Sequence, residues 1–333
     1  EGDTKSFTID FIDWKNPENN LFHCTGEYKV ERIGFQKHYI PDIVLFINGI
    51  PLVVIECKRS AYTQTKKKPI DLAIDQLDDY QAKDGIPQLF LYSQLLLTLA
   101  RDKARYGTTG TSRRFWARWR EADLDSPIEQ LIKAPLTQEN IDKLLSEPFT
   151  DVRKKYLAFL DQGRKIYEQD RTLYALCRPQ RLLELAYKFI LYDGGIKKIA
   201  RYQQYFTVHD IVDRVMSVAA NEPRRGGVVW HTQGSGKSLT MVMLAKSLAL
   251  RTDILNPKVI LVTDRIDLDD QIYKNFARCG AVIEPEERVR AGSGEHLRLL
   301  LTEDHRYVFT LIQKFGTERG QRYPKLSDRD DII

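Results

Sequence analysis

A glycine-rich loop constrains the fold of this chain more than any other feature of its sequence. An apolar run at 228–230 leads into the loop at 231–238, and a helical pattern follows over 239–250. Glycines let backbone N–H groups turn toward an anion, and the first turn of the following helix adds its positive dipole. A strand-to-helix junction of this kind belongs to a parallel α/β sheet, so we expect a phosphate-binding loop in such a sheet.

The residues of this loop suggest individual roles. Gly234, Ser235 and Gly236 would surround the phosphate groups of a nucleotide. Lys237 would reach the β and γ phosphates, and the hydroxyl of Ser238 would ligate Mg²⁺. A glycine-rich surface turn is the alternative interpretation of the same residues.

Strand and helix patterns divide the chain into three parts. Residues 201–333 alternate apolar runs with helical patterns, which is typical of a parallel sheet built from βαβ units. Residues 121–200 predict a helical connector, and residues 1–120 predict a mixed α/β domain with one helix. The expected strands lie at 7–12, 42–47, 52–58, 88–97, 228–230, 259–263 and 307–312, and the expected helices at 70–82, 140–145, 152–167, 181–191, 239–250, 268–276 and 295–301.

Two charged residues end an otherwise apolar strand in the first part. Residues 42–58 form two apolar runs joined by Asn48 and Gly49, which is a strong hairpin signal. Side chains alternate between the faces of a strand, so Glu56 and Lys58 share one face. Charges at the end of a buried strand are costly unless a site needs them. The alternative is an exposed strand end with an incidental ion pair.

The register of this hairpin decides whether an acidic pair forms. A plain two-residue turn would place Asp42 opposite Ile55. A three-residue loop, or Gly49 in a left-handed bulge position, would bring Asp42 opposite Glu56, and we predict that offset. The two carboxylates could then share a Mg²⁺ ion, and Lys58 could orient or activate an attacking water.

Two polar residues lie on one face of the helix that follows. Gln76 and Tyr80 are separated by one helical turn. The alternatives are a solvated helix residue for Gln76 and a half-buried packing residue for Tyr80. The apolar positions of this helix are Ile70, Ala73, Ile74 and Leu77.

This combination resembles a nuclease motif. Pro-Asp, a strand, a tight turn and a second strand ending in Glu-x-Lys resemble the PD-(D/E)xK motif. Gln76 and Tyr80 are similar to the Gln-x-x-x-Tyr element that follows this motif in a subset of such nucleases. The resemblance implies catalytic roles for Asp42, Glu56, Lys58, Gln76 and Tyr80, with Asp42 and Glu56 as metal ligands.

Further motifs extend the resemblance over nearly the whole chain. They read Arg201-Tyr-Gln-Gln-Tyr-Phe, Trp230-His-Thr-Gln-Gly-Ser-Gly-Lys-Ser, Thr263-Asp-Arg and Thr310-Leu-Ile-Gln-Lys-Phe. In this order they resemble the motor (R) subunit of type I restriction endonucleases, a family that has a histidine where stricter phosphate loops have their first glycine. Helicase-like motors carry an upstream glutamine that reads the adenine edge. Gln204 stands at that place, although Gln203 or Gln204 as a plain polar helix residue is the alternative.

The resemblance implies a Mg²⁺-dependent DNA nuclease followed by the first RecA-like lobe of an ATP-driven double-strand DNA translocase. It implies methyltransferase and specificity subunits as partners, in the cytoplasm of a bacterium or archaeon. The sequence ends where we expect the strand before the Walker B motif, so we expect an incomplete lobe that binds nucleotide without coupled hydrolysis. Alternatives are a DNA-repair nuclease-helicase and a non-catalytic module that binds DNA and nucleotide.

The charge balance limits how such a chain would hold DNA. Its 51 basic and 46 acidic residues leave a net charge of +5, so binding must rest on local grooves. The segment 113–120 interleaves arginines with aromatics and could contact phosphates and bases, or pack its aromatics and leave its arginines in solvent. The lysines at 66–68 could contact phosphates or form a solvated loop. No apolar run approaches the roughly 20 residues of a membrane span.

Overall fold

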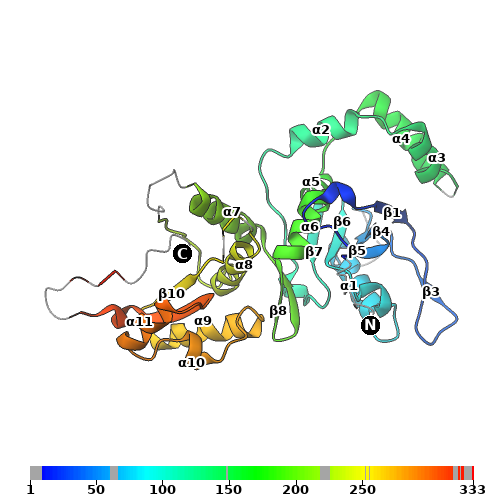
Figure 1. The fold of residues 1–333 in the computed structure, drawn as a ribbon. Helices are drawn as coiled ribbons and strands as arrows, with labels where there is room; N and C mark the ends of the chain where they lie inside the picture. Colours follow the sequence, from blue (N-terminus) through cyan, green and yellow to red (C-terminus); the bar gives the residue numbers. More distant parts are fainter. Residues whose placement is uncertain are drawn as a thin grey trace, which may run out of the picture. The chain divides into compact units, whose positions relative to one another are not determined.

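The computed structural model of this chain describes residues 10–60, 67–147, 149–217, 226–251, 253–254, 256–317, 322, 324–325 and 332–333. The chain divides into two compact units, Glu1–Tyr187 and Lys188–Ile333 (Figure 1). Within the described residues, no helix is long and apolar enough to cross a membrane.

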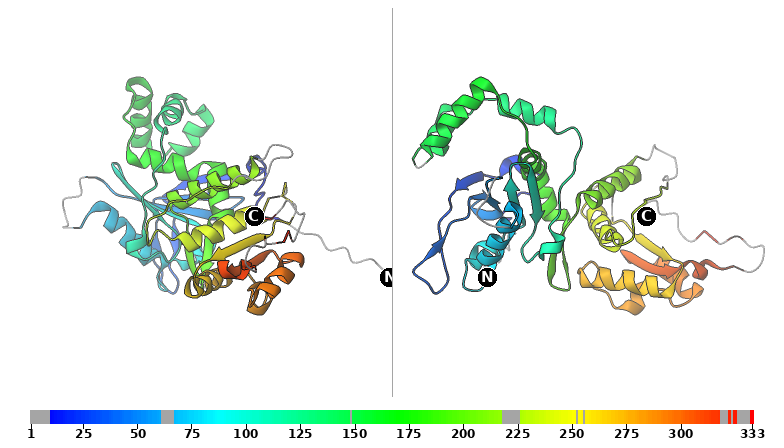
Figure 2. Two further views of the ribbon diagram at one scale, coloured as in Figure 1. Left: turned by 90° about the vertical axis from the view of Figure 1, so that its left-hand side faces the viewer. Right: turned by 180° about the vertical axis from the view of Figure 1, so that it is seen from behind.

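A five-stranded mixed sheet is the centre of the first unit (Figures 1 and 2). The strands lie in the order β1-β4-β5-β6-β7. β5 and β6 are parallel, and the other neighbouring strands are antiparallel. The strands are Phe22–Gly26 (β1), Ile43–Ile47 (β4), Ile50–Cys57 (β5), Leu95–Ala100 (β6) and Lys103–Gly107 (β7).

Helix α1 (Pro69–Gln81) connects the two parallel strands and covers one face of the sheet. A crossover of this kind is required because parallel neighbours cannot be joined by a tight turn. Its apolar positions face the sheet, whereas Asp78 and Asp79 are exposed. The core under the helix contains Val44, Val54, Ile70, Ile74, Leu77, Tyr80, Phe90 and Leu96.

The turn between β4 and β5 contains two residues. Ile47 pairs with Ile50, and the intervening Asn48 and Gly49 have φ angles of +50° and +82°. Asn-Gly is the sequence that best tolerates two successive positive φ angles. The prediction of a three-residue loop, one of the two expected sources of the register offset, is therefore wrong.

A bulge within β5 supplies the offset instead. Leu52 is the extra residue, because the pairing shifts there by one position. Beyond the bulge Ile43 pairs with Ile55, so the next position along each chain sets Asp42 opposite Glu56. The predicted juxtaposition is confirmed, although its cause is a bulge in the strand and not in the turn.

In the part of the first unit that the structure describes, a small hairpin and five further helices complete the fold, the last helix ending at Lys188. The hairpin pairs Val30–Glu31 (β2) with His38–Tyr39 (β3). Short 3₁₀ segments occur at Pro17–Asn19 (η1), Pro87–Phe90 (η2) and Arg113–Phe115 (η3). The helices are Asp125–Lys133 (α2), Gln138–Leu144 (α3), Thr150–Gln162 (α4), Glu168–Cys177 (α5) and Pro179–Lys188 (α6).

The second unit is built around two parallel strands. Val259–Thr263 (β10) pairs with Tyr307–Leu311 (β11), and Ile332 forms a parallel bridge with Lys258. A hairpin of Ile190–Asp193 (β8) and Ile196–Ile199 (β9) precedes them. The helices are Tyr202–Met216 (α7), Lys237–Ala249 (α8), Ile266–Arg278 (α9), Glu286–Val289 (α10) and Gly294–Thr302 (α11), and Ile312–Phe315 (η4) is a 3₁₀ turn.

Some expected elements differ from the structure. Residues 228–230 are not a strand, because no described strand pairs with them, and Val228 and Trp230 are 95% and 89% exposed. The expected strand at 7–12 begins outside the described residues, and its described part is not a strand. Of the lysines at 66–68 that could contact phosphates, Lys66 also lies outside the described residues. The hairpin at 190–199 lies in a segment where only helices were expected.

Candidate functional site

Five side chains converge at one edge of the sheet in the first unit. Asp42 precedes β4, Glu56 and Lys58 lie at the end of β5, and Gln76 and Tyr80 lie on α1. The parallel β5-α1-β6 connection places the helix over this strand end. We call these five residues the carboxylate site.

Lys58 is the centre of the hydrogen-bond network in the carboxylate site. Its Nζ lies 2.5 Å from Oε1 of Glu56 and donates at 2.5 Å to Oε1 of Gln76. The amide nitrogen of Gln76 in turn donates to the hydroxyl of Tyr80. The helical spacing of Gln76 and Tyr80 therefore creates a continuous chain of contacts from the strand to the helix.

Tyr80 completes the network from the buried side. Its hydroxyl donates to the carbonyl of Ile40 at 3.3 Å and lies 3.5 Å from Oε2 of Glu56. The ring is 1% exposed. Burial, followed by the charge of Glu56, raises the pKa of Tyr80, so the phenol stays protonated as a donor.

The two carboxylates of the site have different environments. Oδ2 of Asp42 accepts a 2.6 Å hydrogen bond from the backbone N–H of Cys57. Glu56 is 0% exposed. Burial raises the pKa of Glu56 to about 7; the hydrogen bond from Lys58 opposes this shift and the charge of Asp42 adds to it.

This arrangement fits a divalent cation. Asp42 and Glu56 bring two carboxylates together, and Glu56 is buried with a raised pKa. A cation between the two carboxylates would relieve the repulsion between their negative charges. In the part of the chain that the structure describes, no group of three or more His, Cys, Asp or Glu side chains is arranged around a metal position. Mg²⁺ suits a site with two carboxylates, because it retains several of its waters.

The glycine-rich loop forms a second candidate site in the other unit. Gly234 and Gly236 have φ angles of +76° and +87°, and Gly236 is the residue that precedes the first turn of α8. Lys237 is exposed. Among the described residues the buried hydroxyl of Ser235 has no hydrogen-bond partner. Positive φ angles, a helix N-terminus and an unpaired hydroxyl together fit a phosphate group.

Gln204 is bound directly to this loop. Its amide nitrogen donates to the carbonyl of Gly236 at 3.1 Å, and its amide oxygen accepts from the backbone N–H of Arg201 at 2.9 Å. The side chain is 5% exposed. Gln204 therefore links the start of α7 to the loop.

The remaining loop residues surround an open cavity. Its volume is about 500 Å³, and it is lined by Val229, Trp230, His231, Thr232, Gln233 and Lys237. Nε2 of His231 lies 3.0 Å from the hydroxyl of Thr207 on α7. The lysine and histidine of the motif thus border one cavity, whereas Ser238 lies in the first turn of α8.

Sequence reasoning missed three contributors to these sites. Leu52 sets the register, the carbonyl of Ile40 receives Tyr80, and Thr207 contacts His231. Thr207 lies one turn after Gln204 on the same helix, and that spacing was the only available signal. The other two act through the backbone and leave no side-chain pattern.

Two family models match the chain, one on each unit. Residues 1–115 match the N terminus of the type I restriction enzyme R protein. Residues 203–333 match the SWI2/SNF2 ATPase family. The first match contains the carboxylate site, and the second contains the glycine-rich loop.

Curated relatives cover the whole chain. The endonuclease subunit of the type I restriction enzyme HindI from Haemophilus influenzae is 30% identical over 344 residues, covering 100% of this chain. A Methanocaldococcus jannaschii protein named as the endonuclease subunit of the type I restriction enzyme MjaIXP is 31% identical over 340 residues and also covers 100%. The chain belongs to the family of type I restriction enzyme endonuclease subunits. It spans 30% and 29% of the lengths of the MjaIXP and HindI subunits.

Proposed function

We propose that this chain is the nuclease and first motor portion of a type I restriction enzyme R subunit, with a PD-(D/E)xK nuclease that cleaves DNA phosphodiester bonds with Mg²⁺. The observation that supports the proposal is the convergence of five side chains: hydrogen bonds join Glu56, Lys58, Gln76 and Tyr80. Asp42 lies opposite Glu56 in the strand register. Family membership supports the reaction class.

Each residue of the carboxylate site has a chemical role in this proposal. Asp42 and Glu56 would hold Mg²⁺, which when bound stabilises negative charge on the scissile phosphate. Lys58 orients the attacking water and stabilises the charge that develops on the phosphate. Gln76 positions the Lys58 ammonium, and Tyr80 anchors Gln76 and Glu56 from the buried side.

The second unit is proposed to bind ATP with Mg²⁺ as the first RecA-like lobe of a motor. The backbone of Gly234, Ser235 and Gly236 would hold the phosphates, with Lys237 on the β and γ phosphates and Ser238 on Mg²⁺. Gln204 would serve the nucleotide by fixing the loop at Gly236, and its contact with adenine stays a proposal. The match to the SWI2/SNF2 ATPase family supports this assignment.

In the whole protein, ATP hydrolysis would drive translocation along double-stranded DNA and would be coupled to cleavage. The partners would be the methyltransferase and specificity subunits of a restriction-modification complex, in the cytoplasm of a bacterium or archaeon. The names of the relatives support this setting, since each of those cited above is an endonuclease subunit of a type I restriction enzyme.

Nicking of supercoiled plasmid by the purified chain tests the nuclease assignment. We expect Mg²⁺-dependent nicking that is abolished in Asp42→Ala and Lys58→Ala and retained in Lys237→Ala, which alters only the other unit. A chain that binds DNA but never nicks it would favour a non-catalytic DNA-binding module. Unchanged cleavage by Lys58→Ala in the complete complex would contradict the assignment.

A further inference from the structure

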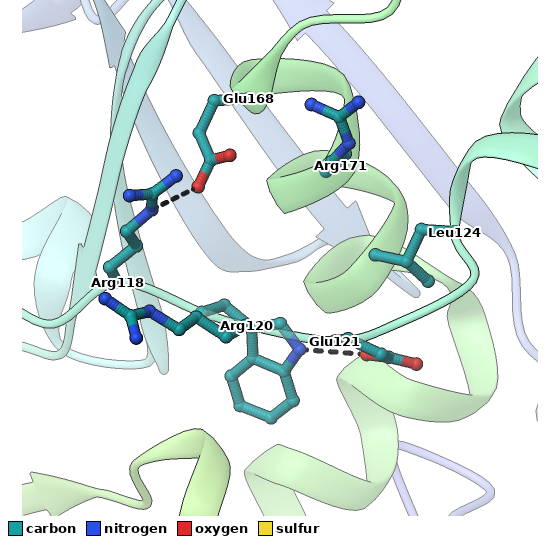
Figure 3. Close-up of a pocket in the computed structure, with 7 residues that line it drawn as sticks. Arg118, Arg120, Glu121, Leu124, Glu168 and Arg171 are labelled. Atoms are coloured by element: carbon teal, nitrogen blue, oxygen red, sulfur yellow. Dashed lines mark hydrogen bonds and ion pairs between the residues drawn. The ribbon is translucent and has the colours of Figure 1, made fainter.

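A small pocket lined by arginines lies in the first unit, outside the carboxylate site. Its volume is about 230 Å³. Figure 3 shows the residues that line it. Arg118 and Arg120 come from the segment after β7, and Arg171 comes from α5. The other lining residues are Trp119, Glu121, Leu124 and Glu168. We call it the arginine pocket.

The three arginines keep hydrogen-bond donors available. Arg118 contacts Glu168 through Nε at 2.6 Å, as the dashed line in Figure 3 marks. Arg171 contacts Asp125 through Nε and Nη2 at 2.6 and 2.7 Å. Arg120 is exposed and makes no hydrogen bond or ion pair with any residue that the structure describes. A guanidinium has five N–H donors, so each retains donors for an anion.

The carboxylates around the pocket do not neutralise its positive charge. Glu121 is engaged by Arg178 at 3.2 Å and by Arg181 at 2.9 Å. Burial opposes ionisation of Glu121, but hydrogen bonds from Arg181 and Trp119 outweigh it and lower its pKa. The residues that line the pocket include three arginines and two glutamates, an excess of one positive charge, and Arg178 and Arg181 outside the lining offset the charge of Glu121.

Strand pairing places this pocket at the same edge of the sheet as the carboxylate site. β6 runs parallel to β5, so the end of β6 lies beside Glu56, and β7 starts again from that edge. Ala117 forms an antiparallel bridge with Tyr106, so residues 118–120 return along β7 toward the edge. The N-terminal turn of α5 lies there too, because Gln169 exchanges two 3.1 Å hydrogen bonds with Arg101 in the β6-β7 turn.

The spacing of the strands suits contact with a single duplex. Going across the sheet from β5, the 118–120 segment comes third, after β6 and β7, which is about 14 Å at the usual distance between neighbouring strands. The major groove of B-DNA is about 12 Å wide. A duplex with one phosphate at the carboxylate site can therefore present another phosphate to the arginine pocket.

We propose that the arginine pocket, with the unpaired Arg120 as its central donor, binds a phosphate of the DNA backbone and holds the duplex for cleavage at the carboxylate site. The inference rests on the proposed nuclease function. The four arginines of the 113–120 segment have different roles in this proposal. Arg118 and Arg120 line the pocket. Arg113 forms ion pairs with Asp71 and Asp75, and Arg114 stacks on Phe115.

The test measures duplex binding by the whole chain against salt concentration. Fluorescence anisotropy of a labelled duplex, with EDTA to prevent cleavage, gives the slope of log affinity against log salt. Arg120→Ala should reduce the slope by about 0.9, so between 50 and 200 mM salt its affinity should fall about 3.5-fold less than that of the wild type. Arg120→Lys should keep most of the slope. Arg114→Ala, an exposed arginine stacked within the same segment, is the matched control and should leave it unchanged.

Plasmid nicking separates failure of this inference from failure of the nuclease assignment. We expect Arg120→Ala to raise the DNA concentration needed for half-maximal nicking. An unchanged salt slope in Arg120→Ala, with nicking still abolished by Asp42→Ala, would overturn the pocket and leave the nuclease standing. The pocket would also be overturned if Arg120→Ala bound DNA as the wild type does but no longer assembled with partner subunits. A wild-type chain that neither binds nor nicks DNA would overturn both.

Discussion

The ammonium group of Lys58 donates a 2.5 Å hydrogen bond to the amide oxygen of Gln76, which lies 18 residues later on a different element. The contact joins the end of β5 to α1 at the point where the two carboxylates meet. Gln76 accepts from Lys58 and donates to Tyr80, so its amide has one orientation that satisfies both partners. The position of the Lys58 Nζ therefore depends on the helix as well as on its own strand.

Removing this contact should slow cleavage without unfolding the unit. In Gln76→Ala, Lys58 keeps its ion pair with Glu56 but loses the partner that fixes its direction. Displacement of a catalytic group by about 1 Å costs on the order of 100-fold in rate, so we expect a 10- to 100-fold slower maximal rate of plasmid nicking. Asp79→Ala, an exposed position of the same helix, is the control. Equal rates for Gln76→Ala and wild type would show that Gln76 is only a packing residue.

The stability of the metal-free chain should fall as the pH rises through the range set by Glu56. Its pKa is about 7 in the folded state against 4.5 in the unfolded chain, because burial and then Asp42 disfavour the charge. Between these two pKa values the carboxyl of Glu56 is ionised in the unfolded chain but protonated in the folded chain, so rising pH favours unfolding. The decrease in unfolding free energy is complete above pH 7. The difference corresponds to roughly 3 kcal/mol.

Urea unfolding at pH 5 and pH 8 in EDTA measures this effect. The decrease in unfolding free energy between the two pH values should be smaller in Glu56→Gln, which cannot ionise. Other titrating groups contribute equally to both proteins, so the difference between the two decreases isolates Glu56. Parallel decreases in the two proteins would contradict the raised pKa.

Local patterns predicted the elements with a periodic apolar face or a continuous apolar run. The helix at 268–276 and α1 follow from apolar positions at helical spacing, whereas the strand at 259–263 and the helix at 239–250 follow from nearly continuous apolar runs. The run at 228–230 has the same apolar character as a strand. A strand also needs a neighbouring strand to accept and donate its backbone hydrogen bonds, and a local sequence pattern does not show whether one is present.

The carboxylate site was predictable to a similar depth. Two-residue and four-residue spacings place Glu56 with Lys58 and Gln76 with Tyr80. The bulge at Leu52 was not predictable, because an inserted apolar residue within an apolar run changes no pattern. The contact of Gln204 with the carbonyl of Gly236 joins positions 32 residues apart, and only the tertiary fold brings them together.

Mg²⁺ should stabilise the chain through the carboxylate pair. A ligand that binds only the folded state adds about 1.4 kcal/mol to the unfolding free energy at ten times its dissociation constant. We expect a gain of this order at pH 8, where Glu56 is ionised, and loss of most of it in Asp42→Asn. Asp79→Asn controls for non-specific cation binding to the surface. If the two variants gained equally, Mg²⁺ would be acting elsewhere, for example at the glycine-rich loop.

The glycine-rich loop should not tolerate a side chain at Gly236. Its φ angle is +87°, and a Cβ atom there would lie 2.7 Å from the amide nitrogen of Gln204. Gly236→Ala therefore combines backbone strain of about 1 kcal/mol or more with displacement of Gln204, and both disturb the N–H groups that would face the phosphates.

We expect Gly236→Ala to weaken binding of a fluorescent ATP analogue by at least about 10-fold, which is 1.4 kcal/mol. Gly227→Ala is the matched control, because a Cβ there meets no atom within 4 Å and Gly227 has no positive φ angle. Plasmid nicking should be the same in both variants, since the carboxylate site lies in the other unit. Equal nucleotide affinity in the two variants would mean that this loop does not bind the phosphates, and the assignment of Gly234, Ser235 and Lys237 would fall with it.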